Sequence, residues 1–169
     1  MKKNYEPCEL NPGLYSQMPN VRKFDLAKDI EEIEAGRYDL VLHSHVLEHI
    51  PCNIAHSLLH IHRIRKPGGI HACIIPVSPG RWDQSFEPTL SEDEKTRRLG
   101  KHDHMRRIGK KDATSTIGKI VNVANYIDFD ATADFSRETL MLYNILDNHW
   151  YGLITGTSLL LGKQDYLLK

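Results

Sequence analysis

Histidine is the residue type with the clearest chemical potential in this sequence. The chain has 10 histidines in 169 residues, and His43, His45 and His49 lie close together. His45 and His49 are four residues apart, which would place them on one face of a helix. Two such histidines and a carboxylate could bind zinc, as in a zinc hydrolase. However, Glu48 directly precedes His49, so the HExxH pattern of metalloproteases is absent. The sequence alone therefore predicts no metal ligand.

A histidine could instead act as a general base. The ordinary pKa of histidine lies near neutrality, so its neutral ring can accept a proton from a reacting group. His45 follows an apolar run, and His104 lies in a charged segment. Both are candidate catalytic residues, and each could equally be a structural hydrogen-bonding group.

The charged segment around His104 is strongly basic. Between Lys95 and Lys111 there are eight lysines and arginines against one acid, Asp103. The segment could be a solvated helix and loop. It could also form a pocket for a small anionic substrate, with Arg106 as a bidentate clamp and His104 beside it. Nucleic acid is the less favoured ligand, because no aromatic residue lies between Phe86 and Tyr126 to stack on bases.

Two apolar runs flank a helical pattern and would position these residues. Residues 38–44 and 70–77 are typical of buried strands. Between them, residues 52–66 have apolar side chains at helical spacing, with Asn53 as a candidate cap and Pro-Gly-Gly after the end. Strand, helix and strand in this order predict a parallel βαβ crossover.

The other elements are predicted from weaker patterns. Ser91 followed by Glu94 is typical of a capping box at the start of a helix. The expected strands are residues 5–10, 21–26, 126–135 and 158–164, and the expected helices are 28–34, 90–99, 110–122 and 138–148. Together they predict one α/β domain over residues 1–169, with a charged insertion at about 78–109. The expected fold is Rossmann-like, a mostly parallel sheet with helices on both faces.

Four motifs in this order resemble a known enzyme family. They are ELNPG at residues 9–13, FDL at 24–26, HSHVLEHI at 43–50 with RKPGG at 65–69, and HDHMRRIG at 102–109. The order is similar to class I S-adenosylmethionine-dependent methyltransferases, in the branch that carries HVLEH and KPGG. The resemblance covers about residues 5–109.

The resemblance implies a cofactor site at the carboxyl ends of the strands, where open α/β sheets bind ligands. It implies that Glu9 holds the cofactor ribose and that Asp25 faces the adenine amino group. The turn that begins at His43 would approach the methionine part. The cofactor contacts expected for S-adenosylmethionine are Glu9, Leu10, Asp25, Leu26, His43, Ser44 and His45.

One family feature is not found in the sequence. The family's first strand ends in a glycine-rich loop, and no GxGxG precedes residues 5–10. The reading frame could be truncated, the second strand could pair directly with the fourth, or another chain could fill the gap. Because an incomplete sheet leaves an apolar edge or face to cover, we expect a homodimer.

Composition excludes several classes of protein. Lys+Arg and Asp+Glu are both 22, which argues against a general polyanion binder. No apolar stretch approaches the roughly 20 residues that span a bilayer, and the first residues do not resemble a signal peptide. Cys8, Cys52 and Cys73 form no CxxC pair, so we expect reduced thiols in a cytoplasmic protein.

Two functions follow from these observations. The first is an S-adenosylmethionine-dependent methyltransferase acting on a small, anionic molecule, with His104 and Arg106 facing the substrate. The alternative is a degenerate methyltransferase-like protein that no longer catalyses and serves as a binding or assembly partner. The sequence does not identify the substrate or the atom that is methylated.

Overall fold

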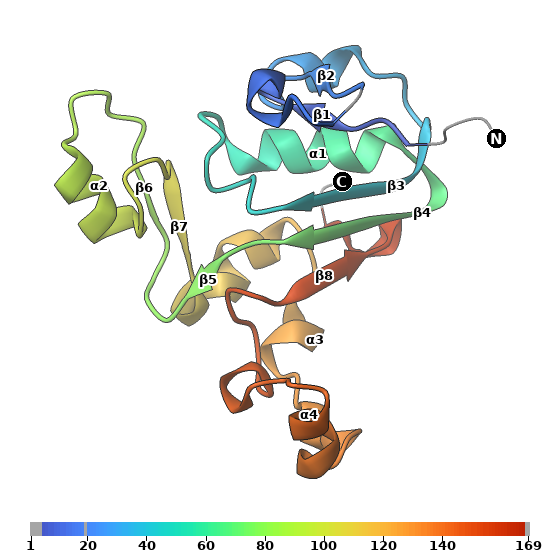
Figure 1. Cartoon of the computed structure of the whole chain (residues 1–169), viewed down its shortest axis with the longest axis vertical. Coiled ribbons are helices and arrows are strands. Elements are labelled where there is room, and N and C mark those ends of the chain that lie inside the picture. Colours follow the sequence, from blue (N-terminus) through green and yellow to red (C-terminus); the bar gives the residue numbers. More distant parts are fainter. Residues whose placement is uncertain (1–4, 19, 168–169) are drawn as a thin grey trace.

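A three-stranded sheet forms the centre of the fold in the computed structural model, which describes residues 5–18 and 20–167. The strand order is β3 (Tyr38–Ser44), β4 (Arg65–Ile74) and β8 (Ser158–Leu161). β3 and β4 are parallel, and β8 runs antiparallel to β4 (Figure 1). The parallel crossover and the late strand predicted from sequence are confirmed.

Helix α1 (Ile54–Ile64) connects the two parallel strands. The Asn53 side chain accepts a hydrogen bond from the Ala55 amide at 2.9 Å, so it caps the helix as predicted. The helix ends where Arg65 turns to extended backbone, before the Pro-Gly-Gly segment. Its apolar stripe is buried against the sheet and consists of Ile54, Leu58, Ile61 and Ile64.

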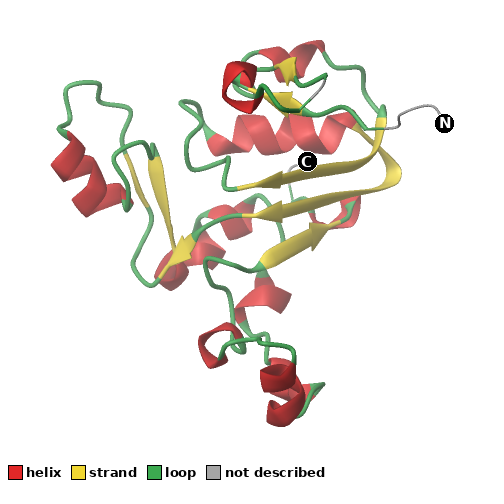
Figure 2. Ribbon diagram, viewed as in Figure 1, coloured by secondary structure: helices red, strands yellow, loops and turns green. Residues whose placement is uncertain are grey.

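The two faces of the sheet differ sharply. Figure 2 shows α1 and the helical turns after residue 110 behind the sheet. On that face Leu58, Cys73, Ile117 and Leu161 belong to one buried cluster. On the opposite face four apolar side chains are exposed, namely Leu40 (54%), Leu42 (68%), Ile70 (45%) and Leu160 (63%). The pairing of β3, β4 and β8 places these four residues on one surface, named here the open sheet face.

The first two strands form a separate parallel pair. β1 (Cys8–Glu9) pairs with β2 (Arg22–Lys23), and neither pairs with β3. Figure 1 shows this pair above α1, and no strand of the described residues lies between it and β3. Direct pairing of the second and fourth family strands, one of the three explanations for the missing glycine loop, is therefore wrong. The open edge of β3 has no strand partner among residues 5–18 and 20–167.

The charged segment folds as a small unit beside the carboxyl ends of β3 and β4. Ser91 accepts a hydrogen bond from the Glu94 amide at 3.2 Å, which confirms the predicted cap. Gly100, with φ of 97°, ends the helix that Ser91 caps. The elements of the unit are β5 (Val77–Ser78), β6 (Asp83–Gln84), α2 (Glu92–Leu99) and β7 (Arg106–Gly109), with strand order β5-β7-β6.

The segment after residue 109 differs most from the sequence prediction. The helix expected at 110–122 consists of 3-10 turns at Lys110–Ser115 and Ile117–Lys119. The hydroxyl of Thr116 donates to the Asp112 carbonyl at 2.8 Å, so a side chain competes for the backbone acceptor. The helix expected at 138–148 is shorter, α4 (Arg137–Leu142).

The strand expected at 126–135 is wrong. This stretch contains the end of α3 (Ala124–Ile127) and a 3-10 turn at Ala131–Ala133. The Asp130 carboxylate accepts hydrogen bonds from the amide and hydroxyl of Thr132, which favours a turn over a strand. Within the described part of the chain, no helix has the length and apolarity needed to cross a membrane.

Candidate functional site

Arg106 organises the turn that follows β3. Its side chain is fully buried, and burial lowers the pKa of its guanidinium. It donates to the carbonyls of Leu47, Ile50 and Cys52, and its Nε donates to Gln84 Oε1 at 3.3 Å. These donors hold the loop between β3 and α1 in place. The expectation that Arg106 clamps an anionic substrate is therefore corrected, because its guanidinium is already satisfied by the protein.

A hollow of about 290 Å³ lies beside this turn. It is formed where β3 and β4 end and where the charged segment packs against them. This is the carboxyl edge of the parallel strands, where open α/β sheets bind ligands. The lining residues are His45, Glu48, His49, Pro76, Ser78, Leu99, Gly100, Lys101, His104, Arg106, Arg107 and Thr155.

One buried carboxylate and three histidines line the hollow. Glu48 is only 1% exposed, and its Oε1 lies 3.2 Å from His45 Nδ1 and 3.7 Å from His49 Nε2. Its other oxygen, Oε2, is buried and has no hydrogen-bond partner. His104 Nδ1 lies 3.0 Å from the Leu99 carbonyl, so Nδ1 is the donor in this hydrogen bond and Nε2 takes no part in it. His45 has φ of 53°, a left-handed conformation that turns the chain sharply after β3.

The structure thus brings together His45 and His104, which are far apart in sequence and were both predicted as site residues. It adds Glu48, which had no expected role, and His49, which the sequence raised only as a candidate zinc partner of His45. The available signal was a carboxylate directly after an apolar pair, Val46 and Leu47. A buried carboxylate needs a compensating charge or hydrogen bonds, which makes it informative.

The residues expected to bind the cofactor lie at the ends of several strands. Glu9 is the last residue of β1 and Asp25 follows β2, and the Phe24 amide donates to the Glu9 carbonyl at 2.9 Å. The Glu9 carboxylate accepts from the Leu10 amide at 2.7 Å, and that of Asp25 accepts from the Ala27 amide at 2.9 Å. Both acids therefore sit at one edge of the β1–β2 pair, as the sequence predicts.

Three other residues expected to contact the cofactor have less distinctive surroundings, namely Leu10, Leu26 and Ser44. Leu10 and Ser44 are exposed, and Leu26 is half-buried against the core. Among the described residues, no hydrogen bond or ion pair joins Glu9 or Asp25 to the turn after β3.

His43 faces the interior rather than the hollow. Its Nε2 lies 2.9 Å from His71 Nε2, and His71 Nδ1 lies 2.7 Å from the Tyr166 hydroxyl. Burial lowers the pKa of His43 to about 4. Burial, with the nearby His43 and Arg65, lowers the pKa of His71 to about 2. Only the backbone of His43 is thus available at the carboxyl edge.

The described residues fit part of a cradle for S-adenosylmethionine. Glu9 at the end of β1, Asp25 after β2 and the turn after β3 supply side chains at the positions that the resemblance implies. No strand with a glycine-rich loop lies between β1 and β3 in the described ranges. Within these ranges, the cofactor site is therefore open on the side where the backbone of a glycine-rich loop would approach the cofactor closely.

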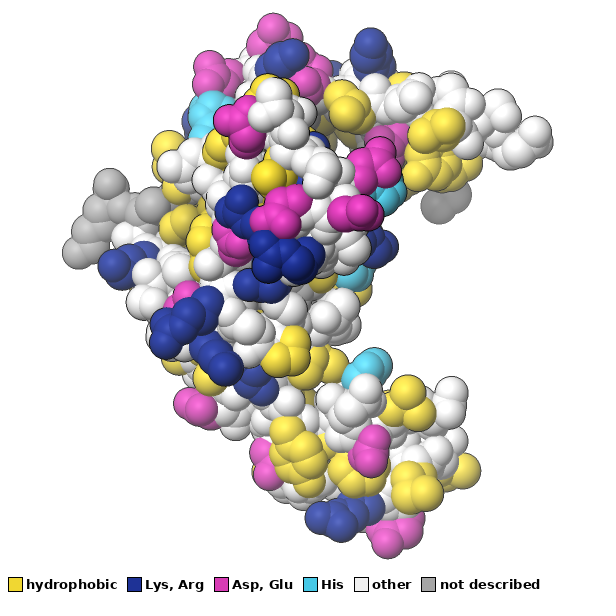
Figure 3. Space-filling model, turned by 90° about the vertical axis from the view of Figure 1, so that its left-hand side faces the viewer, with side chains coloured by type: hydrophobic (Ala, Val, Ile, Leu, Met, Phe, Trp, Pro, Cys, Tyr) yellow, Lys and Arg dark blue, Asp and Glu magenta, His cyan; other side chains and the backbone are white. Residues whose placement is uncertain are grey.

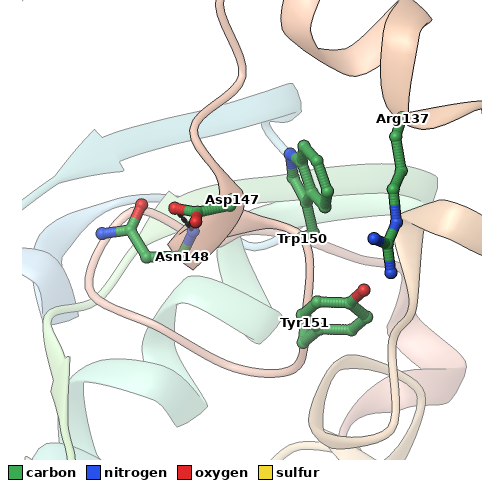
Figure 4. Close-up of a pocket in the computed structure, with 5 residues that line it drawn as sticks. All are labelled: Arg137, Asp147, Asn148, Trp150 and Tyr151. Carbon is green, nitrogen blue, oxygen red and sulfur yellow. Dashed lines mark hydrogen bonds between the residues drawn. The ribbon is translucent and has the colours of Figure 1, made fainter.

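A second hollow, of about 340 Å³, lies near α4 (Figure 4). Figure 4 shows the Trp150, Tyr151 and Arg137 side chains around it. The Asp147 carboxylate accepts from the Asn148 amide at 2.7 Å, and the Trp150 indole donates to a backbone carbonyl. These side chains include no nucleophile paired with a base, so this hollow does not have the residues of a catalytic site.

Much of the basic charge predicted around His104 is paired within the protein. Figure 3 shows lysine and arginine side chains next to acidic ones on this side of the molecule. Arg97 pairs with Glu94 at 2.5 Å, and Arg98 pairs with Asp83 at 2.8 Å. Lys101 is exposed at the hollow.

One comparison with known proteins identifies the family of this chain. The family model described as a methyltransferase domain matches residues 3–110, which is well over half of the chain, so the chain belongs to this family. A solved structure of the trans-methyltransferase CalH with SAH is 30% identical over 38% of this chain and 20% of that one, with a TM-score of 0.29. A chain from the complex of the Haloferax volcanii Trm112 methyltransferase activator with a candidate methyltransferase is 17% identical, with a TM-score of 0.40. That match covers 76% of this chain and 55% of the other. A search of curated proteins finds no match.

Proposed function

We propose that this member of the methyltransferase-domain family acts in S-adenosylmethionine-dependent methyl transfer to a small molecule. The observation that carries the proposal is the hollow at the carboxyl ends of β3 and β4, with His45 and buried Glu48 in its wall. It lies within residues that the family model matches, apart from Thr155. The cofactor would supply an electrophilic methyl group to an acceptor bound there.

His45 is the proposed general base. Its side chain is 47% exposed, and its Nδ1 hydrogen-bonds to the Glu48 carboxylate. That bond makes Nδ1 the donor and leaves Nε2 able to accept a proton from an acceptor hydroxyl or amine. Glu48 would then act as a positioning residue, fixing the tautomer of His45 and stabilising its charged form.

A small anionic acceptor fits the lining best. A hollow of about 290 Å³ is at the lower end of the size of small-molecule sites. Lys101 and Arg107 bring positive charge to it. Arg107 donates through Nε to the Arg81 carbonyl, and the rest of its guanidinium is the proposed anion contact in place of Arg106.

The finer assignment to the branch with HVLEH and KPGG is also part of this proposal. The KPGG segment has a local role that supports it. A Cβ added at Gly69 would lie 3.0–3.2 Å from the carbonyl oxygens of Lys66, Tyr38 and Asp39, so glycine allows β3 and β4 to meet closely. Lys66 pairs with Asp39 at 2.7 Å across the same strands.

The competing function is a domain that binds but does not catalyse. The unpaired edge of β3 and the absence of a glycine-rich loop in the described ranges favour it. Isothermal titration with S-adenosylmethionine and S-adenosylhomocysteine separates the two. We expect heat of binding that Asp25→Ala weakens at least tenfold and the exposed control Asp134→Ala leaves unchanged. No heat at high protein concentration would leave only the binding or assembly function for this chain.

Catalysis by His45 needs its own test. Once an acceptor has been found among small anionic hydroxyl compounds, His45→Gln should lower kcat by 100-fold or more while the affinity for S-adenosylhomocysteine stays unchanged. His149→Gln, at an exposed position, is the matched control. Equal kcat in His45→Gln and the wild-type chain would remove His45 as the base.

We also propose that the chain forms a homodimer through the open sheet face and the free edge of β3. Figure 3 shows the molecule hollowed on the side that carries this face, between its upper part and the α4 projection. Two copies meeting there would cover Leu42 and Leu160 and extend the sheet. By light scattering, Leu42→Arg should give a monomer, and Leu142→Arg, on the exposed α4, should stay dimeric. A monomeric wild-type chain would refute the dimer, and loss of the dimer only in Leu142→Arg would move the interface to α4.

We also propose a cytoplasmic location, which rests on the expectation that the three cysteines are reduced thiols. All three cysteines are free, and Cys73 lies in the core, where burial raises the pKa of its thiol to about 12. A thiol of this kind is inert packing rather than a nucleophile.

A further inference from the structure

Three ligand groups converge at the floor of the hollow. Glu48, His49 and His104 each offer one ligand atom, and these atoms lie within 4.8 Å of one another. Zinc bonds of about 2.1 Å to nitrogen and oxygen hold tetrahedral ligands roughly 3.4 Å apart. The His49 Nε2 to Glu48 Oε1 distance is already 3.7 Å. Rotations of the two rings that move their nitrogens by about 1 Å would therefore close a coordination sphere.

One ring nitrogen of each histidine is held by a hydrogen-bond acceptor. His104 Nδ1 lies 3.0 Å from the Leu99 carbonyl, and His49 Nδ1 lies 3.3 Å from the Asp103 carbonyl and 3.5 Å from its carboxylate. Histidines that bind metals nearly always donate their other ring nitrogen to such a carbonyl or carboxylate. The outer contacts thus select the tautomer in which Nε2 is free on both rings.

Glu48 provides an independent reason to expect a cation. Its side chain is 1% exposed, and Oε2 is buried without a hydrogen-bond partner. Oε1 is shared between His45 and His49, so it is the better-satisfied oxygen. A buried carboxylate with an unsatisfied oxygen is costly unless a positive charge compensates it. The compensating charge is either a protonated histidine or a metal ion.

We propose that Glu48, His49 and His104 bind a divalent transition-metal cation of the Zn²⁺ class, with its remaining coordination positions open to the hollow. Two imidazoles and one carboxylate suit zinc and similar first-row ions better than magnesium or calcium, which prefer oxygen ligands. Three protein ligands with an open position are typical of zinc sites that bind an exchangeable ligand. The inference goes beyond the proposed methyl transfer and stands whether or not the chain binds S-adenosylmethionine.

The sequence could not show this site. His49 and His104 lie on two segments that meet only in the folded chain, and the backbone amide of Met105 donates to the Glu48 carbonyl at 2.8 Å to join them. The spacing of histidines in the sequence instead favours another pair, His45 and His49. The site proposed here uses one histidine from each segment.

Zinc binding to the whole purified chain tests the inference without any assay of activity. The chain is stripped with a chelator, dialysed, and titrated with Zn²⁺ against a chromophoric competitor. We expect one tight site per chain, weakened 100-fold or more by His104→Asn and by Glu48→Gln. His102→Asn is the matched control, because it removes an exposed histidine two residues from His104.

Two other clusters could bind zinc, and the experiment separates them. One consists of Glu31, His56 and His60, and the other of His43, His71 and Cys73. His60→Asn should leave the tight site unchanged. Substitution of Co²⁺ for Zn²⁺ should give a visible spectrum without a thiolate charge-transfer band, which excludes a site that uses Cys73.

Loss of folding in His104→Asn or Glu48→Gln does not end the test, because His49→Asn removes a ligand that is less buried than the other two. The His49 side chain is 37% exposed, so this variant should stay folded and lose 100-fold or more in zinc affinity. The inference is overturned if the wild-type chain binds no zinc or if the tight site is lost in His60→Asn. Full zinc affinity in folded His104→Asn or in His49→Asn also overturns it, and protonated histidines would then compensate Glu48.

Discussion

Acid should destabilise this protein because two interior histidines cannot easily take up a proton. His43 and His71 share a hydrogen bond, and the pKa values of both are far below the ordinary 6.5. The groups that face them are Tyr166, Arg65 and Cys73, of which Arg65 carries a positive charge against His71. Among the described residues, no carboxylate is hydrogen-bonded to either ring, so an imidazolium there would have no carboxylate to stabilise it.

The sign and size of the effect follow from linkage. Below pH 6.5 the unfolded chain protonates both histidines, and the folded chain does not until pH falls to about 4 for His43 and about 2 for His71. Stability is therefore full above pH 6.5 and is lost as pH falls toward these values. Each histidine contributes roughly 1.4 kcal/mol per pH unit in this window. Acidification from pH 7.5 to 4.5 should therefore lower the free energy of unfolding by about 5 kcal/mol through the two histidines. This loss is comparable with the total stability of many domains.

Urea unfolding at pH 7.5, 6.5, 5.5 and 4.5, in the presence of a chelator, measures this loss. His71→Asn removes one titrating ring, so it should be less stable than wild type at pH 7.5 but lose only about half as much on acidification. The exposed variant His149→Asn should follow the wild-type curve. A wild-type chain whose stability is flat from pH 7.5 to 4.5, or an unchanged acid loss in His71→Asn, would refute the reasoning.

Three further changes test the packing around the site by urea or thermal unfolding. Arg106→Leu should cost about 3 kcal/mol or more, because it leaves the carbonyls around a buried guanidinium without donors; a change under 1 kcal/mol would contradict its structural role. Gly109→Ala should cost about 1–3 kcal/mol, since a Cβ there would overlap with the Arg81 backbone, and an unchanged midpoint would show that the segment yields freely. Asn53→Ala should cost about 1 kcal/mol through loss of the α1 cap to Ala55, and stability equal to wild type would argue against that cap.

The βαβ unit could be predicted because its signals are local. Residues 38–44 have the apolar run of a strand, Asn53 caps the next helix, and Gly68 has φ of 77° near the start of β4, where the register with β3 shifts. Each of these signals acts within a few residues of the structure that it specifies. The same is true of the Ser91 cap on α2.

The C-terminal third could not be predicted for the opposite reason. Between residues 110 and 157, short 3-10 turns and side-chain caps decide the path of the chain, and apolar periodicity is a poor guide to them. Phe135, Met141, Leu142 and Tyr143 are all more than half exposed, so apolar residues there do not mark an inner face. A pattern that assumes burial therefore predicts a strand or a long helix where the chain forms neither.

The role of Arg106 shows how burial changes the meaning of a residue. In the sequence it is one of eight basic residues in a short segment, and anion binding is the natural interpretation. In the fold it is fully buried and donates to carbonyls of the loop that contains Glu48. The same arginine that cannot bind substrate therefore holds the carboxylate near His104. Because β7 supplies Arg106 and the turn before it supplies His104, the charged segment builds the site through backbone contacts rather than through its net charge.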